Sequence, residues 1–429
     1  MNFNKIMNKI KIDKIVFGGQ GMGELDGKKV FLWNVLPGEE VEFETTKKKK
    51  DFVEGIATKI VKPSKYRIEP KEDHYLSCSP WQIMDESKED EFKKEMVLET
   101  FQRIGKFGED LDLDIYSDQN FYGYRNKMEY SFWFKEDESV SLAFYDRGGR
   151  YRNVIEPCQL AHPSINKVAV QILEWLNENK ISNRNLKSLI VRSNLKGEIM
   201  VGLFLKDKLK FKNYPEFGSE CIGFKIYYSF YKSPASVPTE LIYSWGKDYL
   251  EEEILGAVMR YGLFSFFQVN VPVFTEALKD ISKFIKKGEK VVDYYSGVGA
   301  IGLSLANKCK TVELVESSKE AVSYARENIK LNEFKNVKAE ICEAEAMTNL
   351  ISADKTIIFD PPRAGLHEKV VAKVLEELPK KIIYMSCNIS TQARDLQKFL
   401  PEYKIVFSKL YNFFPRTPHV EGLIVLEKK

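Results

Sequence analysis

Residues 10–61 alternate short apolar runs with turn signals. Runs such as KVFLW and VEFET are separated by closely spaced glycines, by Asp26–Gly27 and by Pro37–Gly38. Short strands at this spacing predict a small antiparallel barrel of the OB type, a fold that binds nucleic acid through one strand face and its loops. On a predicted hairpin of this barrel, Lys47–Lys50 would contact phosphates or, alternatively, form a solvated turn.

The next segment loses this periodicity and then takes up a helical one. Residues 63–81 are interpreted as a linker. From Ser87 to Gly105 apolar side chains recur at helical intervals, so we expect Ser87 to start a helix and Gly105 to end it. This helix is expected to pack on the C-terminal part of the chain.

Strands dominate from residue 121 to about residue 258. Aromatic and arginine residues are interleaved there, as in FYGYRN and FYDRG. Such interleaving suits stacking on unpaired bases beside phosphate contacts, and it suits a β-core equally well. We therefore predict three domains: the barrel over residues 1–62, a central β-rich, RNA-binding domain over 63–262, and a third domain over 263–429.

In the third domain strands and helices alternate up to the C-terminus. This alternation predicts a doubly wound parallel sheet with a ligand at the carboxyl ends of its strands, and hence an α/β fold. Gly297, Gly299 and Gly302 follow the first strand with the spacing GxGxxG, and Glu316 ends the second strand. This fingerprint alone is equally typical of nicotinamide dinucleotide enzymes.

Two further motifs favour a methyl donor over a nicotinamide. Asp293 precedes the glycine loop in DYYSGVG, which resembles the first motif of S-adenosylmethionine-dependent methyltransferases. Asp360 opens the sequence DPPR after the fourth strand, and a D/N-P-P motif there resembles methyltransferases that act on planar nitrogenous bases. We find no hydride-transfer site in the sequence and therefore expect S-adenosylmethionine at these strand ends.

A cysteine lies where the following strand gives way to a helix. Lys381–Met385 predicts a short buried strand, and Thr391 is expected to cap a helix with its hydroxyl group. Backbone N–H groups and the helix dipole at such a junction favour an anion, so Cys387 is predicted to be partly a thiolate. That placement suits a nucleophile, and a small buried hydrophobe is the alternative.

The motifs FFQVN, DYYSGVGAIG, FDPPRAG, YMSCN and PHVE occur in this order and together resemble the RNA uridine-C5 (5-methyluridine) methyltransferases. The barrel in turn resembles the RNA-binding TRAM module, so the resemblance spans the chain from residue 10 to the C-terminus. It implies that S-adenosylmethionine contacts Gln268, Tyr295, Glu316, Glu343 and Asp360. It also implies that Cys387 is the nucleophile and Glu421 the proton acceptor.

The chemistry of uracil explains why a thiol and a carboxylate are needed. C5 is a poor nucleophile until a thiolate adds at C6, which turns the ring into an enolate that can attack the sulfonium methyl group. Glu421 then removes the C5 proton and Cys387 is expelled. Because addition needs access to a ring face, the uridine must come from a loop or be flipped out of its stack.

The TRAM-like barrel favours 23S rRNA as the substrate, with uridine 54 of tRNA as the alternative. A non-catalytic RNA-binding protein and an NAD-dependent oxidoreductase are more distant alternatives. Of the 429 residues 44% are hydrophobic and 30% charged, and the net charge is +3. With no apolar run of about 18 residues and no signal-peptide core, we expect a cytoplasmic protein that does not enter a membrane.

The six cysteines are scattered and form no CxxC pair, which argues against a disulfide framework and a zinc knuckle. Many members of the family that the chain resembles hold an iron–sulfur cluster with four cysteines. Only Cys78 and Cys158 match that pattern, and Glu72 and Trp81 stand at two of the other positions. A cluster needs about four thiolates, so we expect neither a cluster nor another metal, and instead packing around Trp81.

Overall fold

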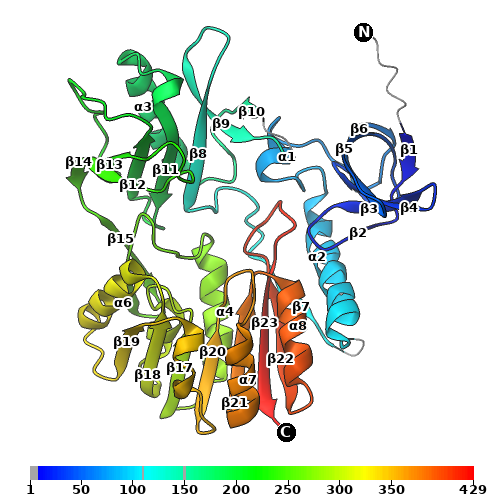
Figure 1. The fold of residues 1–429 in the computed structure, drawn as a ribbon, viewed down its shortest axis with the longest axis vertical. Coiled ribbons are helices and arrows are strands. Elements are labelled where there is room, and N and C mark those ends of the chain that lie inside the picture. Colours follow the sequence, from blue (N-terminus) through cyan, green and yellow to red (C-terminus); the bar gives the residue numbers. More distant parts are fainter. Residues whose placement is uncertain (1–7, 109–110, 148–150) are drawn as a thin grey trace.

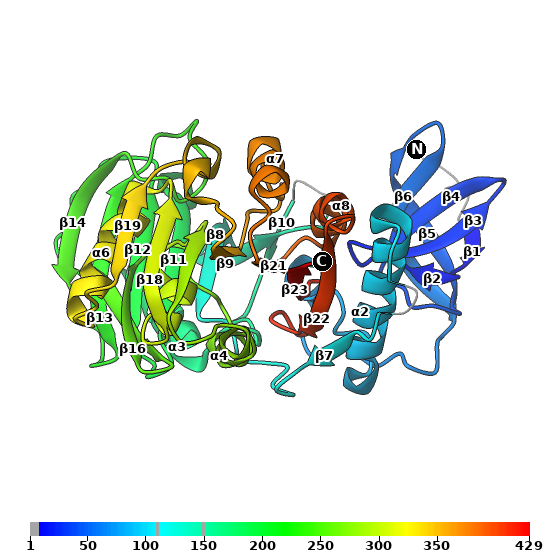
Figure 2. The same cartoon turned by 90° about the horizontal axis from the view of Figure 1, so that it is seen from below.

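The computed structural model describes residues 8–429 except 109–110 and 148–150, and the described residues form four sheets (Figure 1). The carboxyl edge of the C-terminal sheet faces the N-terminal barrel and the central sheet, which lie side by side above it (Figures 1 and 2). Among the described residues, no helix has both the length and the apolar character needed to cross a membrane.

The N-terminal sheet curls into a barrel with the strand order β1-β5-β6-β4-β3-β2. Its strands are β1 (Asn8–Lys11), β2 (Lys14–Ile15), β3 (Gly21–Leu25), β4 (Lys28–Trp33), β5 (Glu40–Lys48) and β6 (Phe52–Lys62). Alternate residues, among them Ile10, Leu32 and Phe43, fill its small core. At Gly23 a Cβ atom would lie 2.3 Å from the carbonyl oxygen of Lys11, so the close crossing of β1 and β3 requires a glycine. In contrast to the antiparallel prediction, β4 pairs with β6 in parallel.

The segment predicted as a linker is packed rather than open. It contains the short helix α1 (Tyr75–Cys78), and Ser79–Met84 are buried between the barrel and α2 (Glu86–Thr100). Asp85, not Ser87, caps α2, because its carboxylate accepts a hydrogen bond from the Ser87 N–H group at 2.9 Å. After α2 the chain continues as a π-helix, η1 (Phe101–Gly105), which lies against α8 (Ile389–Phe399) of the C-terminal domain.

The central sheet has the strand order β10-β9-β8-β11-β12-β13-β14. Its strands are β8 (Lys127–Phe134), β9 (Val140–Tyr145), β10 (Arg152–Val154), β11 (Leu186–Ser193), β12 (Ile199–Leu205), β13 (Cys221–Tyr228) and β14 (Glu240–Gly246). The apolar stripe of α3 (Pro163–Glu178) packs on this sheet and builds a separate core, and η2 (Asn183–Asn185) follows it. The hairpin of β15 (Tyr249–Ile254) and β16 (Ala257–Gly262) leads to the C-terminal domain.

The C-terminal sheet has the order β19-β18-β17-β20-β21-β23-β22-β7, and β23 is antiparallel to its neighbours. Its elements are β7 (Asp114–Tyr116), α4 (Val271–Lys283), β17 (Glu289–Tyr294), α5 (Ala300–Leu305), β18 (Cys309–Glu316), α6 (Lys319–Leu331), β19 (Val337–Ile341), η3 (Ala344–Ala346), η4 (Thr348–Leu350), β20 (Lys355–Phe359), α7 (Glu368–Glu377), β21 (Lys381–Ser386), α8, β22 (Tyr403–Tyr411) and β23 (Glu421–Lys428). On one face Val291 and Ile358 pack with α4, α5 and α6. On the other Val292 and Ile357 pack with α7 and α8. The predicted α/β fold with a doubly wound sheet is thus confirmed.

Candidate active site

The glycine loop between β17 and α5 is fixed by two carboxylates. Asp293 is buried, and its Oδ2 accepts a hydrogen bond from the Gly302 N–H group at 2.9 Å. Burial raises the pKa of Asp293 to about 8. Glu316, at the end of β18, accepts the Gly297 N–H group at 3.0 Å. The loop therefore keeps one shape, in which Tyr295 has a left-handed φ of 63°, a conformation that costs about 1 kcal/mol and is concentrated at functional sites.

A pocket opens beside this loop at the carboxyl edge of the sheet. Of the residues predicted to contact the donor, Gln268, Tyr295 and Asp360 line it. The remaining lining residues are Phe266, Phe267, Phe274, Ser296, Gly297, Val298, Ala300 and Ile301. Glu316 reaches the pocket indirectly, through its bond to Gly297. Glu343 is not among the lining residues, because it is exposed beyond the end of the edge strand β19.

Cys387 lies in a second pocket, directly after β21. The helix that follows begins at Ile389, and its cap is the Asn388 side chain, which accepts the Ser390 N–H group at 3.1 Å. The prediction that Thr391 caps this helix is therefore wrong. Asn388, Ser390 and Thr391 are all suitable capping residues, and the tertiary structure selects the first.

The surroundings of Cys387 oppose the predicted thiolate character. Burial, followed by the nearby carboxyl groups of Glu421 and Asp360, raises the pKa of the thiol to about 11. Arg363, in the DPPR motif, opposes this shift. Burial is the largest cause of this raised pKa and the carboxyl groups of Glu421 and Asp360 add to it, so the protonated thiol is favoured.

Glu421 stands at the start of β23, which runs between β21 and β22. The antiparallel register pairs Ser386 with Gly422, so the strand ends that carry Cys387 and Glu421 are neighbours. Glu421 is only 3% exposed, and its Oε2 has no hydrogen-bond partner among the described residues. Burial, and then Asp360, raise its pKa well above the ordinary range, whereas Arg363 lowers it. Cys387, Glu421, Asp360 and Arg363 thus form one electrostatically connected group.

Comparison with known proteins matches residues 85–429 to the family model described as tRNA (uracil-5-)-methyltransferase. The chain belongs to this family. An uncharacterised RNA methyltransferase of Fusobacterium nucleatum is 32% identical over 98% of this chain and 96% of its own length. Another, from Caldanaerobacter subterraneus, is 31% identical over the full length of both chains.

Among solved structures, the Pyrococcus abyssi tRNA (uracil-54, C5)-methyltransferase in complex with S-adenosyl-L-homocysteine has a TM-score of 0.79 and 25% identity. The match covers 98% of this chain and 100% of that chain. The enzyme class predicted from the motifs, an S-adenosylmethionine-dependent RNA uracil-C5 methyltransferase, is therefore confirmed.

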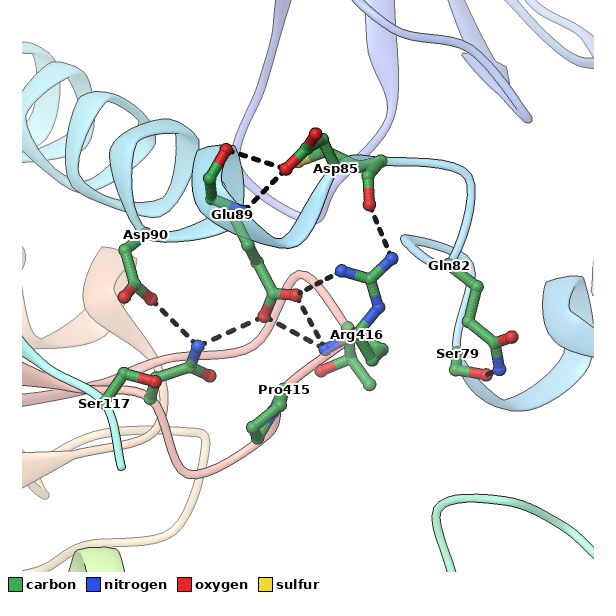
Figure 3. A network of polar contacts seen from close by, with 12 residues as sticks. Ser79, Gln82, Asp85, Glu89, Asp90, Ser117, Pro415 and Arg416 are labelled. Atoms are coloured by element: carbon green, nitrogen blue, oxygen red, sulfur yellow. Dashed lines mark hydrogen bonds and ion pairs between the residues drawn. The ribbon is translucent and has the colours of Figure 1, made fainter. Parts of the chain in front are cut away.

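In this uracil methyltransferase a buried ionic network holds the segment that leads to Glu421 (Figure 3). Glu89, on α2, accepts hydrogen bonds from the backbone N–H group of Arg416 at 2.9 Å and from Lys93 at 2.7 Å. Asn412 donates to the same carboxylate at 3.1 Å. Glu89, Lys93 and Arg416 are fully buried, so the Glu89 carboxylate offsets part of the positive charge of the two cations inside the protein. Glu89 and Lys93 are four residues apart on α2, but no local pattern in the sequence points to Asn412 and Arg416, which lie more than 300 residues away.

The barrel contributes a wall to the cysteine pocket. Phe17 and Gly18 of its glycine-rich turn line the pocket opposite Cys387, and Phe17 is 42% exposed. The next residue, Gly19, contacts the chain before Glu421 so closely that a Cβ atom would lie 2.2 Å from Cβ of Pro418. The glycines were recognised in the sequence as turn residues, but their contact with the active site was not. Arg363, Asn388, Pro418, His419 and Val420 complete the lining.

Proposed function

We propose that the protein methylates C5 of a specific uridine in 23S rRNA, with Cys387 as the nucleophile and Glu421 as the base. The observation that carries this proposal is the pairing of β21 with β23, which places a thiol and a buried carboxyl group on adjacent strand ends. Uridine 54 of tRNA is the alternative substrate, and the name of the Pyrococcus neighbour favours it.

The residues have distinct roles in this scheme. The Cys387 thiol gives up its proton to solvent and its sulfur adds to C6, which places electron density on C5. S-adenosylmethionine supplies the methyl group that C5 attacks and is left as S-adenosylhomocysteine. Glu421, once ionised, removes the C5 proton, and the bond between sulfur and C6 breaks to restore the free enzyme. Arg363 favours the ionised forms of both catalytic groups, since it lowers the pKa of each.

For the donor, we propose contacts with Gln268, Tyr295 and Asp360, which line the pocket beside the glycine loop. Ligands of doubly wound sheets bind at this carboxyl edge, which supports the assignment. Glu316 would act from the end of β18, where it also holds the Gly297 N–H group. We do not extend the proposal to Glu343, which lies outside the pocket lining.

For the RNA, we propose that the barrel (1–62) and the central domain (63–262) hold the substrate while the C-terminal domain (263–429) carries out the reaction. Two observations support this division. Lys47–Lys50 are exposed at the hairpin between β5 and β6, where phosphates can approach. Phe17 opens toward solvent at the cysteine pocket, where an aromatic ring can stack on an unpaired base.

A trapping experiment tests the two catalytic roles separately. Glu421→Gln retains the thiol but lacks the base, so it should accumulate covalently bound to methylated RNA. With RNA labelled through the methyl group, this variant should give a slowly migrating protein–RNA band on a denaturing gel. Cys387→Ala should bind RNA and S-adenosylmethionine yet give neither band nor product. Turnover of Glu421→Gln at the parent rate without a trapped band would assign Glu421 a structural role.

The choice between substrates needs a separate measurement. Mapping of 5-methyluridine in total RNA from a deletion strain should show loss of the modification at one or more positions of 23S rRNA. Loss at position 54 of tRNA, with 23S rRNA unchanged, would replace the proposed substrate by the alternative.

A further inference from the structure

Four potential metal ligands from two distant segments meet in one cluster. Glu72, His74 and Cys78 come from the segment around α1, and Cys158 follows β10. One ligand atom of each residue lies within 4.8 Å of those of all the others. Glu72, His74 and Cys158 are buried and Cys78 is half-buried, so this is not a chance group of surface acids.

The donor set and its spacing fit one metal ion rather than an iron–sulfur cluster. A cluster needs about four thiolates, and this group contains the sulfurs of Cys78 and Cys158 alone. Tetrahedral Zn²⁺, with Zn–S bonds of about 2.3 Å and bonds of about 2.0 Å to nitrogen and oxygen, holds two sulfurs about 3.8 Å apart and the lighter ligands about 3.3 Å apart. The four atoms lie within 4.8 Å of one another, so side-chain movements of up to about 1.5 Å would bring them to that arrangement.

The polar atoms around the cluster support the same conclusion. His74 Nε2 is buried and faces Glu72 Oε1 at 3.1 Å, in a contact that does not have the geometry of a hydrogen bond. Gln82 donates to Glu72 Oε2 at 2.6 Å, and the Gln159 N–H group donates to Oε1 at the same distance. Hydrogen bonds of this kind to the oxygens of a carboxylate ligand hold it in the orientation that a metal ion needs. The His74 imidazole nitrogen and a Glu72 carboxylate oxygen therefore lie close enough together to bind the same ion.

We propose that Glu72, His74, Cys78 and Cys158 bind one structural Zn²⁺ ion. From the sequence we expect no metal here, because only Cys78 and Cys158 match the four-cysteine pattern. The ion joins the segment before α2 to the central sheet. Trp81, three residues beyond Cys78, donates its backbone N–H group to the Arg416 carbonyl at 3.1 Å and its indole N–H group to the Gly19 carbonyl at 3.3 Å. The site therefore supports the segment on which both the barrel turn and the chain before Glu421 rest.

Elemental analysis of the full-length protein tests this proposal directly. Purified from zinc-supplemented medium, the chain should contain about one zinc per molecule and no stoichiometric iron or acid-labile sulfide. Cys158→Ser should lose the zinc. Cys221→Ser is the matched control, because Cys221 is also a buried free thiol in the central domain but lies outside the cluster. Zinc retained equally by both variants would refute the proposal, as would stoichiometric iron with sulfide.

Two further measurements avoid reliance on a variant that fails to fold. The unmodified apoprotein, titrated with Co²⁺, should develop the visible bands of a tetrahedral ion and thiolate-to-cobalt charge transfer. Gln82→Ala leaves all four ligands in place but removes the hydrogen bond from Gln82 to the Glu72 carboxylate. Loss of this bond should weaken zinc affinity about 10- to 100-fold. A folded apoprotein, checked by circular dichroism, that binds neither Co²⁺ nor Zn²⁺ would overturn the assignment. Unchanged zinc affinity in Gln82→Ala would also count against it.

Discussion

The raised pKa of Cys387 predicts how slowly this thiol reacts when no RNA is bound. A rise from 9.0 to about 11 lowers the thiolate fraction at pH 7.5 about 100-fold, equivalent to about 2.7 kcal/mol. Each thiolate that does form is more nucleophilic, by about eightfold for two pKa units at a Brønsted coefficient of about 0.45. The two effects combine to an alkylation rate about tenfold below that of an ordinary thiol. The rate should rise about tenfold per pH unit from pH 7 to 10 and level off near pH 11.

Iodoacetamide labelling, with the Cys387 peptide quantified by mass spectrometry, measures this rate. The same peptide in the urea-unfolded chain is the control, because its thiol has lost both the burial and the neighbouring carboxyl groups. Glu421→Gln removes one of the groups that raise the pKa, so its plateau should shift to lower pH. A plateau at or below pH 8.5 in the folded parent would show that the site stabilises the thiolate, and the reasoning from burial and carboxyl groups would be refuted.

Two further predictions concern the ligands. Replacement of Lys47–Lys50 by alanine should make RNA binding less dependent on salt. The slope of the log binding constant against log salt concentration should fall by up to about 0.9 per lost phosphate contact on a duplex. Most of this effect should come from Lys48–Lys50, because Lys47 already pairs with Glu54 at 2.9 Å. An unchanged slope, measured by fluorescence anisotropy, would make the run a solvated turn. Asp360→Ala should weaken S-adenosylmethionine binding about 10- to 150-fold in calorimetry, since a hydrogen bond to a charged group contributes about 1.5–3 kcal/mol. Unchanged affinity and turnover would exclude Asp360 from the donor site.

Periodicity predicts the catalytic sheet well because both of its faces are buried. Consecutive residues such as Val291 and Val292 pack on opposite helix layers, so the strand is a continuous apolar run, and the helices between such runs show one apolar stripe. The glycine loop is predictable for a similar reason. At Gly299, with φ of 91°, a Cβ atom would lie 2.8 Å from Leu303 Cδ1. This backbone conformation therefore requires a glycine, and the glycine in the sequence in turn indicates the loop.

What the sequence does not predict depends on contacts between distant segments. The raised pKa of Cys387 results first from burial and then from Glu421 and Asp360, which other strands bring to it. His74 gains significance only when folding places it beside Cys158, 84 positions further along the chain. Short-range patterns carry no information about such pairs, and a resemblance to a family transfers only the residues that the two share.

The Glu89 network yields the last prediction, because one buried carboxylate pairs with two buried cations. Glu89→Gln removes the carboxylate and leaves the cations Lys93 and Arg416 buried without its negative charge. Removal of one partner from a buried ion pair costs about 3–5 kcal/mol. Glu91→Gln, on the same helix, is the matched control, since Glu91 pairs with Lys88 at the surface and such pairs contribute at most about 1 kcal/mol. In urea unfolding, the free energy of unfolding of Glu91→Gln should therefore lie within about 1 kcal/mol of that of the parent. That of Glu89→Gln should be about 3–5 kcal/mol lower.

The pH dependence adds a second readout for this network. Burial lowers the pKa of Lys93, so between that pKa and 10.5 the unfolded chain binds more protons than the folded one, and this residue's contribution to stability rises with pH. Without Glu89 the folded pKa of Lys93 should fall further. The deficit of Glu89→Gln relative to the parent should therefore shrink as the pH is raised toward 10. Arg416 precedes Glu421 by only five residues, so Glu89→Gln should also disturb the catalytic segment. Added to Glu421→Gln, it should reduce the amount of trapped RNA adduct, measured without denaturant at a pH at which both proteins are folded. A Glu89→Gln protein as stable as Glu91→Gln at pH 7 would mean that the buried cations are solvated or neutral and that the network does not hold the catalytic segment.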